Sequence, residues 1–196
     1  EVGLSLHSER SAASAAAVRH ALGPGAALHH HANGAPGVRG ARVSVSHGAG
    51  LTLAVAHRQR LIGCDVQGLD GVDAKAWPVL LGEQRWAFAR DLAAAAGWST
   101  VVACVMVWTA AECLYKIGCR AWPFALHQVD IGDTPHCGPQ LVLKGEALAV
   151  AVGLLRVAGQ PADVAVGVAL GAASIDLDEQ RQDAPGEPVP ADVVSG

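Results

Sequence analysis

Charged side chains are scarce in this sequence, and basic ones are the scarcer kind. Lys and Arg together number 14 against 18 Asp and Glu, the net charge is −4, and charged residues make up only 16% of the chain. A nucleic-acid groove or an anionic membrane surface requires clustered Lys and Arg. The composition therefore argues against both kinds of partner, and we expect any phosphate-binding site to be local.

Cysteine patterns that signal a disulfide framework or a zinc site are missing from the sequence. The chain has five cysteines, an odd number, and no CxxC pair. The first ten residues lack a basic segment followed by an apolar one, and the longest apolar run, VVACVMVW, is far shorter than a membrane span. We therefore expect a cytoplasmic protein.

The sequence has no initiating Met, and residues 176–196 contain few large apolar side chains. That segment is rich in Pro, Asp, Glu and Gly, a composition typical of a flexible tail or linker. We expect the preceding residues to be a monomer or part of a larger multidomain chain.

What the sequence does have is a large apolar fraction, 51% of 196 residues, which is enough for a core in one domain or in two halves that share one. The elements expected in the first part are a strand over 1–7, a helix over 8–23, a loop over 23–40, and strands over 41–47, 51–57 and 60–66. Short GAG and RQR segments separate the last three strands, a spacing typical of an antiparallel meander.

The second part is expected to place two helices before another sheet. The helices are predicted over 82–97 and 100–116, and strand-like runs follow at 124–132, 139–145, 147–155 and 163–171. This order predicts an α+β fold of two similar half-domains related by a pseudo-twofold axis, each a small, mostly antiparallel sheet packed with helices, with a cleft between them. The halves are predicted to span residues 1–70 and 71–175.

Two carboxylates stand in apolar surroundings. Asp65 ends an apolar run, and Glu112 follows the apolar stripe of the 100–116 helix. If the halves pack together, like charges facing one cleft need a cation, and carboxylate oxygens favour a hard ion such as Mg²⁺. In the alternative interpretation, Asp65 caps the turn before Gly68 and Glu112 pairs with Lys116 at i, i+4.

Four short motifs, NGAPG, VSVSH, IGCDVQ and WTAAECLYKIG, follow one another over about residues 30 to 120. Their order and rough spacing resemble those of the 4′-phosphopantetheinyl transferases, whose usual forms are approximately N-G-x-P, S-x-S-H, G-V-D-x-E and W-x-x-K-E-A-x-x-K. The order is similar to that of the longer class, the surfactin-synthetase-activating type, in which two halves are fused. The resemblance implies Mg²⁺-dependent transfer of the phosphopantetheine arm of coenzyme A to a serine of an apo carrier protein, with release of 3′,5′-ADP.

The resemblance also assigns roles to individual residues. Asp65, Glu112 and Gln67 would hold the metal, and Glu112 would also be the base that deprotonates the carrier serine, with Lys116 facing the phosphates as the second catalytic residue. The other residues expected to bind coenzyme A are Ser46, His47, Asn33, Pro36 and Arg19.

The sequence departs from the family pattern at two positions. Gln67 replaces the second acid of the G-x-D-x-E motif, and Ala111 replaces the lysine that usually precedes the glutamate. One of four arginines is expected to supply the missing cation: Arg10, Arg19, Arg39 or Arg42.

Three consecutive histidines, His29 to His31, precede NGAPG. Three adjacent side chains in a loop cannot all face one metal, and no Cys or His follows at finger spacing, so zinc is not the favoured interpretation. Within the resemblance, the imidazoles would lie near the nucleotide and stack on adenine or meet the 3′-phosphate.

Two other function classes stay open. A non-catalytic relative would keep the fold as a structural or docking module of a larger synthase, having lost metal binding through Gln67 and Ala111. An unrelated small hydrolase is the second, although the chain has no GxSxG or HExxH motif. Coenzyme A binding separates the first class from the transferase, because a ligand of the native state raises its stability.

Overall fold

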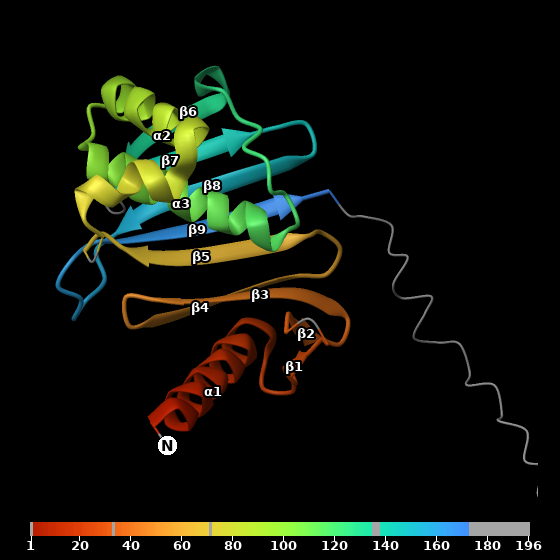
Figure 1. Ribbon diagram of the computed structural model, residues 1–196. Coiled ribbons are helices and arrows are strands. Elements are labelled where there is room, and N and C mark those ends of the chain that lie inside the picture. The colour runs from red at the N-terminus through yellow and green to blue at the C-terminus, as the bar shows by residue number, and fades with distance from the viewer. Residues whose placement is uncertain (1, 33, 71, 135–137, 173–196) are drawn as a thin grey trace, which may run out of the picture.

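The computed structural model describes residues 2–32, 34–70, 72–134 and 138–172, and it confirms the α+β class, with three helices and two antiparallel sheets (Figure 1). The helices are α1 (Val2–Leu22), α2 (Trp77–Ala96) and α3 (Thr100–Lys116), with short 3₁₀ turns η1 (Ala74–Ala76) and η2 (Leu126–Gln128). Over the described ranges, no helix has both the length and the apolar character needed to cross a membrane.

The smaller sheet has the order β1-β2-β3-β4, and the larger one has the order β5-β9-β8-β7-β6. The strands of the smaller sheet are β1 (His29–His30), β2 (Pro36–Val38), β3 (Ala41–Gly48) and β4 (Leu51–His57). Those of the larger sheet are β5 (Ile62–Gly68), β6 (Val129–Thr134), β7 (Gly138–Lys144), β8 (Leu148–Leu155) and β9 (Val164–Gly171).

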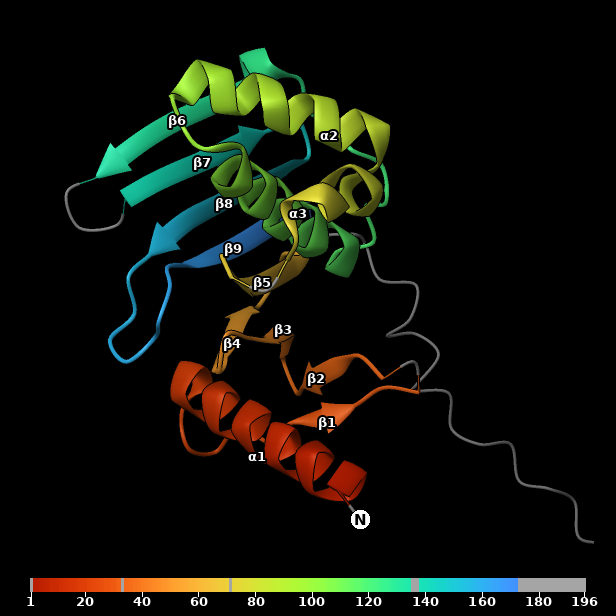
Figure 2. The same cartoon turned by 60° about the vertical axis from the view of Figure 1, so that its left-hand side comes forward.

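The core lies between the larger sheet and the two helices that cover one of its faces (Figure 2). Its fully buried side chains include Met106 and Leu114 of α3, Leu92 of α2, and Leu141 and Leu143 of β7. Helix α1 packs instead on β4 and β3, on the far side of the smaller sheet. Each sheet therefore has its own helical cover, because each has an apolar face that must be buried.

Helix α3 forms where the sequence predicts it. Ser99 precedes it as N-cap, and its hydroxyl accepts a 3.2 Å hydrogen bond from the backbone N–H of Val102. Helix α2 begins at Trp77, earlier than the predicted residue 82, and the non-helical backbone of Gly82 marks a kink at that predicted start. Gly97 ends α2 with a left-handed backbone, φ 68°, and its N–H bonds to the carbonyl of Ala93.

Three local predictions were wrong. Residues 2–7 of the segment predicted as a strand over 1–7 belong to α1, because the Ala-rich helix that follows extends toward the N-terminus. Part of the predicted loop over 23–40 is the β1–β2 hairpin, which a tight turn through Gly34 closes. Strand β5 does not continue a meander with β4 but pairs with β9 along its whole length.

Strand β5 lies at the edge of the larger sheet, beside β3 of the smaller one (Figure 1). Although β5 falls within the predicted range 1–70, its hydrogen-bonded partner β9 lies near residue 170. The division at residue 70 remains a prediction. The seam between β3 and β5 positions the candidate site, and α3 packs across β5.

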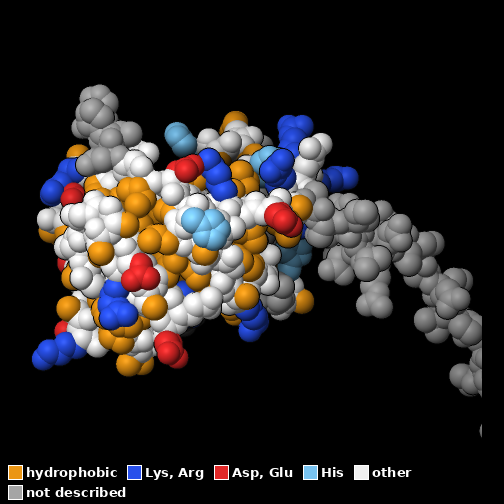
Figure 3. Space-filling view, turned by 90° about the horizontal axis from the view of Figure 1, so that it is seen from above, with side chains coloured by type: hydrophobic (Ala, Val, Ile, Leu, Met, Phe, Trp, Pro, Cys, Tyr) orange, Lys and Arg blue, Asp and Glu red, His pale blue; other side chains and the backbone are white. Residues whose placement is uncertain are grey.

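The surface seen from above, on the side of α2, mixes side chains of all kinds (Figure 3). Acidic and basic side chains are interspersed there with apolar ones. This face therefore presents both signs of charge, as the small net charge of −4 would lead one to expect.

Candidate functional site

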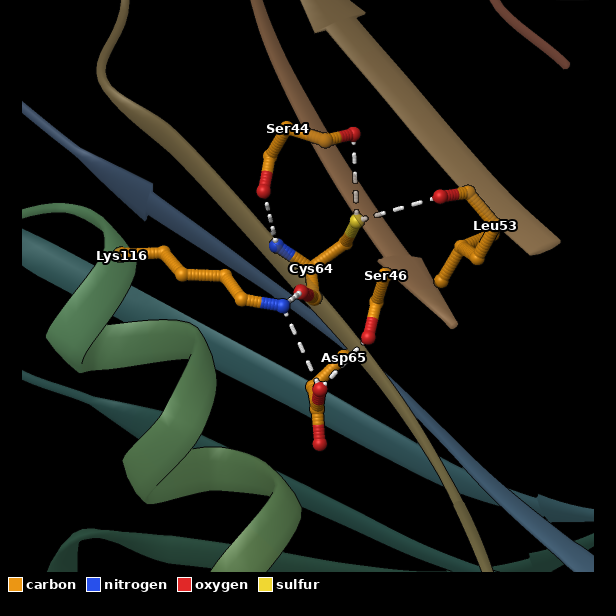
Figure 4. A network of polar contacts seen from close by, with 6 residues as sticks. All are labelled: Ser44, Ser46, Leu53, Cys64, Asp65 and Lys116. Atoms are coloured by element: carbon orange, nitrogen blue, oxygen red, sulfur yellow. Dashed lines mark hydrogen bonds and ion pairs between the residues drawn. The ribbon is translucent and has the colours of Figure 1, made fainter. Parts of the chain in front are cut away.

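A polar network centred on Asp65 joins three of the four sequence motifs (Figure 4). The hydroxyl of Ser46, on β3, donates a 2.7 Å hydrogen bond to Asp65 Oδ1. The ammonium of Lys116, at the end of α3, lies 3.3 Å from the same oxygen and donates a 2.7 Å bond to the carbonyl of Cys64. Side chains from VSVSH, IGCDVQ and WTAAECLYKIG thus meet at one carboxylate.

The network explains how the fold tolerates Asp65, which is only 8% exposed. A buried carboxylate is strongly unfavourable unless it is paired and hydrogen-bonded. Lys116 and Ser46 supply these interactions. Within the described residues, Lys116 pairs with Asp65 rather than with Glu112, and Asp65 lies inside β5 rather than capping a turn. The local alternative for both carboxylates is therefore not what this structure adopts.

Alternation along β5 decides which residues face α3. Residues two apart on a strand share a face, so Gly63, Asp65 and Gln67 lie on one side. A Cβ atom on Gly63 would collide with the carbonyl oxygen of Cys113 in α3, so this side is the one that meets the helix. The missing side chain lets α3 approach β5 closely, and the end of the helix then delivers Lys116 to Asp65.

Glu112 lies half-buried on α3, one helical turn before Lys116. Its pKa is raised, chiefly by burial and then by the negative charge of Asp65, while the cations of Lys116 and Arg85 partly offset the rise. The charges of the two carboxylates therefore interact. A carboxylate whose pKa is raised holds a proton more readily, which is what a general base requires.

The seam between β3 and β5 is made by small side chains on β3. Ser44 Oγ accepts a 3.0 Å bond from the backbone N–H of Cys64, and Cys64 Sγ donates to the carbonyl of Ser44 at 3.3 Å (Figure 4). A Cβ atom on Gly48 would collide with the carbonyl of Val66. Side-chain hydroxyls thus replace the backbone ladder here, and Ser46 is brought to Asp65 as part of that seam.

His47 follows Ser46 on β3 and points to the opposite face, toward α1. Its Nε2 lies 2.9 Å from Ser14 Oγ, and its Nδ1 lies 2.9 Å from Thr52 Oγ1. The imidazole lines a surface pocket of about 420 Å³ together with residues from α1, the β3–β4 turn and β4, among them Glu9, Arg10 and Thr52. Ser46 and His47, the S-H pair of the motif, therefore lie on opposite faces of β3 and contact different residues.

The tautomer of His47 follows from the hydrogen bonds of Ser14. The single hydroxyl proton of Ser14 is donated to the carbonyl of Arg10 at 2.9 Å, so Ser14 Oγ must accept from His47 Nε2–H. Burial and the charges of Arg10 and Lys116 lower the pKa of His47. The ring therefore favours the neutral form, with Nδ1 accepting from the Thr52 hydroxyl.

The remaining expected residues lie in several places. Gln67 is half-buried on the same face of β5 as Asp65, and Pro36 begins β2. Asn33 lies outside the described residues. Arg19 is exposed on α1 and does not line the His47 pocket, whereas Arg10 does. The sequence offers Arg10 as one of four alternatives and places Ser44 at the first serine of the S-x-S-H motif, but it gives no signal for Ser14.

The residues around Asp65 match the donor chemistry of a hard cation. Asp65 and Glu112 supply carboxylate oxygens, and Gln67 supplies an amide oxygen on the same strand face. Burial raises the pKa of Glu112 most and the negative charge of Asp65 raises it further, and a bound cation would offset that charge. Among the described residues, no group of three or more His, Cys, Asp and Glu side chains is arranged to hold a metal.

Comparison with known protein families and with curated proteins finds no match for this chain. The family resemblance is thus carried by four short motifs alone.

Proposed function

We propose that this chain is a 4′-phosphopantetheinyl transferase of the fused two-half class, acting in the cytoplasm on an apo carrier protein with coenzyme A as donor. One observation carries the proposal. Ser46, Asp65 and Lys116 come from three separate motifs of that family and meet in one hydrogen-bonded network, with Glu112 beside them. Motifs that matched by chance would have no reason to converge on one buried carboxylate.

In the proposed reaction, the hydroxyl oxygen of the carrier serine attacks the phosphorus that bears the pantetheine arm. A new P–O bond forms, and the bond to 3′,5′-ADP breaks. Glu112 takes the serine proton, directly or through a water molecule, and Lys116 offsets the negative charge on the phosphates. Mg²⁺ held by Asp65, Glu112 and Gln67 would neutralise charge on the pyrophosphate.

The proposal extends to the surroundings of the site. The two half-domains and a cleft between them are part of it, with coenzyme A lying along the β3–β5 seam. The pocket that Arg10, His47 and Thr52 line would take a phosphate of coenzyme A, since Arg10 supplies a cation there. The protein would act as a monomer or within a larger chain.

A non-catalytic docking module is the second candidate, and one observation favours it. Position 111, where the family usually has a lysine, is an alanine that is only 7% exposed and belongs to the core. No phosphate-facing cation can be contributed there. Together with the amide at Gln67, this leaves the site with less charge than the family pattern has.

The deciding experiment incubates the chain with coenzyme A, Mg²⁺ and a panel of apo carrier proteins, and weighs the carriers by intact mass spectrometry. The proposal expects one carrier to gain a single phosphopantetheine, and expects Asp65→Asn and Glu112→Gln to abolish the gain. Glu83→Gln is the matched control, because Glu83 is an exposed acid on α2. Its activity should equal that of the unmodified chain.

A thermal shift with coenzyme A and Mg²⁺ separates the two candidates. The transferase must bind both and gain stability by mass action. If neither the shift nor the mass gain is seen on any carrier, the transferase proposal is wrong and the docking module is favoured.

A further inference from the structure

The three consecutive histidines do not lie in an irregular loop. His29 and His30 form β1, which pairs with β2 in the register His29 with Gly37 and His30 with Pro36. The pairing continues through a 2.9 Å hydrogen bond from the backbone N–H of His31 to the carbonyl of Ala35. Because side chains alternate along a strand, His29 and His31 share one face of the hairpin and His30 takes the other.

The Nε2 atoms of His29 and His31 converge above Gly37. A Cβ atom on Gly37 would lie 2.5 Å from Nε2 of His29 and 2.6 Å from Nε2 of His31. The two rings lie edge to face, with centroids 5.1 Å apart and an interplanar angle of 73°. Both imidazoles are exposed, whereas Gly37 is buried beneath them. Both Nε2 atoms therefore lie beside the space that a side chain at position 37 would fill.

We propose that His29 and His31 form a binding site for a divalent transition-metal ion of the zinc type. Imidazole nitrogens bind such ions at about 2.0–2.1 Å. The ion cannot occupy the Cβ position itself, which is about 1.5 Å from the Gly37 Cα, so it would lie farther out, toward solvent. The two exposed rings would turn so that both Nε2 atoms face it. Water completes the coordination, since two protein ligands leave positions open.

The surroundings of the pair favour a borderline-soft ion over a hard one. Magnesium and calcium require oxygen ligands, and the pair offers nitrogen only. Arg42 lies opposite Gly37 on β3, and His57 lies opposite Arg42 on β4, so the same row of the sheet has further nitrogen-bearing side chains. The positive charge of Arg42 would oppose binding of the ion itself and favours an anion among the completing ligands.

This site is independent of the proposed transferase activity. It sits on the β1–β2 hairpin, whereas the Asp65 network lies at the seam of β3, β5 and α3. An ion that bridges His29 and His31 above Gly37 binds only the paired hairpin. It would stabilise the native state by mass action, and it would do so whether or not the chain transfers phosphopantetheine.

The test titrates zinc chloride alone into the full chain by isothermal titration calorimetry. One equivalent of zinc should bind, and this binding should require both imidazoles. His29→Ala and His31→Ala should each weaken zinc binding by roughly tenfold or more, since each removes one of two protein ligands. His30→Ala is the matched control, because that ring lies on the other face of the hairpin. Equal zinc binding by the unmodified chain and the His29 and His31 variants would overturn the proposal.

Gly37→Ala gives a second, more specific variant. Its new methyl group would meet the two Nε2 atoms, and the three nearest atoms all belong to exposed imidazoles that can turn away. The variant should fold, as circular dichroism would show, and should lose the zinc equivalent with both histidines still present. Retained binding would contradict convergence above Gly37.

Imidazole NMR distinguishes this site from zinc bound elsewhere. Saturating zinc should shift the Nε2 resonances of His29 and His31 and leave those of His30 in place. Shifts confined to other histidines or cysteines would show that the ion binds another part of the chain, which would overturn the proposal. Displacement of the same signals by inorganic phosphate without metal would identify an anion site instead, and would equally overturn it.

Discussion

The hydroxyl of Ser46 donates a 2.7 Å hydrogen bond to Oδ1 of Asp65 and so ties β3 of the smaller sheet to β5 of the larger one. The same carboxylate oxygen receives the ammonium of Lys116 from α3. This one oxygen atom thus links β3, β5 and α3. The candidate site and the junction between the sheets are therefore the same structure, and a change at either should be felt by the other.

The first prediction concerns that hydrogen bond. Ser46→Ala leaves the buried oxygen of Asp65 with Lys116 as its remaining partner, and we expect it to lower the free energy of unfolding by about 1–3 kcal/mol. Urea unfolding measures the change. Ser11→Ala is the matched control, because Ser11 is exposed on α1 and its loss should change stability little. Equal stability of the two variants would show that the bond contributes nothing to the seam.

Local patterns in the sequence predict part of this arrangement. The apolar period predicts α3, and two strands separated by GAG give the β3–β4 hairpin. The pairing of β5 with β9 could not be predicted, because about 100 residues separate them and alternation does not name a partner. Strand pairing is settled by which apolar faces pack together in three dimensions.

The candidate site was predictable as a set of motifs but not as a network. The sequence places Glu112 and Lys116 at i, i+4, which favours a local ion pair, yet Lys116 reaches across to Asp65 because Gly63 lets the helix approach β5. It also does not indicate that Arg10 lines the His47 pocket whereas Arg19 does not. Helix α1 is so rich in alanine that its sequence hardly indicates which side is buried.

The second prediction tests the close approach of α3. Gly63→Ala places a methyl group against the carbonyl of Cys113, which belongs to helix backbone and cannot turn away. We expect a loss of about 1–3 kcal/mol in the free energy of unfolding from overpacking. The displaced helix should also carry Lys116 away from Asp65 and lower any transferase activity.

Gly153→Ala provides the control for that substitution. Its Cβ would meet the nearest atom, in the side chain of Leu155, at 4.0 Å, an ordinary contact. Urea unfolding of both variants should show a loss at Gly63 that clearly exceeds the one at Gly153. A loss of the same size at both would mean that any alanine in these strands is harmful and that the approach of α3 is not tight.

The third prediction concerns the pH dependence that Glu112 imposes. Burial and the charge of Asp65 raise its pKa above the ordinary 4.5, so the folded chain holds this proton at pH values where the unfolded chain has released it. The contribution of the Glu112 carboxyl to the free energy of unfolding is therefore fully present below pH 4.5, and it is lost as the pH rises through the raised pKa. Glu112→Gln removes the ionisation and should make the fold more stable than the unmodified chain at pH 7.

Urea unfolding at pH 7 and at pH 4 measures this effect. The advantage of Glu112→Gln should shrink at the lower pH, where the native carboxyl is already protonated. Glu83→Gln, at an exposed position on α2, should show no such pH-dependent gain. A Glu112→Gln chain that is less stable at pH 7 would mean that the carboxylate makes favourable contacts which outweigh its burial.

The last prediction separates the two arginines of α1. Burial lowers the pKa of His47 most, and the cation of Arg10 lowers it further, so Arg10→Gln should raise that pKa toward 6.5 without fully restoring it. Arg19→Gln, on the same helix but away from the pocket, should leave it unchanged. Titration of the His47 Cε1 proton by NMR measures both, and equal shifts would show that Arg10 has no special position.

The lowered pKa of His47 also gives the direction of a stability change. Because the folded chain binds this proton less readily than the unfolded chain, the stability that neutral His47 contributes should fall as the pH drops below 6.5. The fall should be less steep in Arg10→Gln.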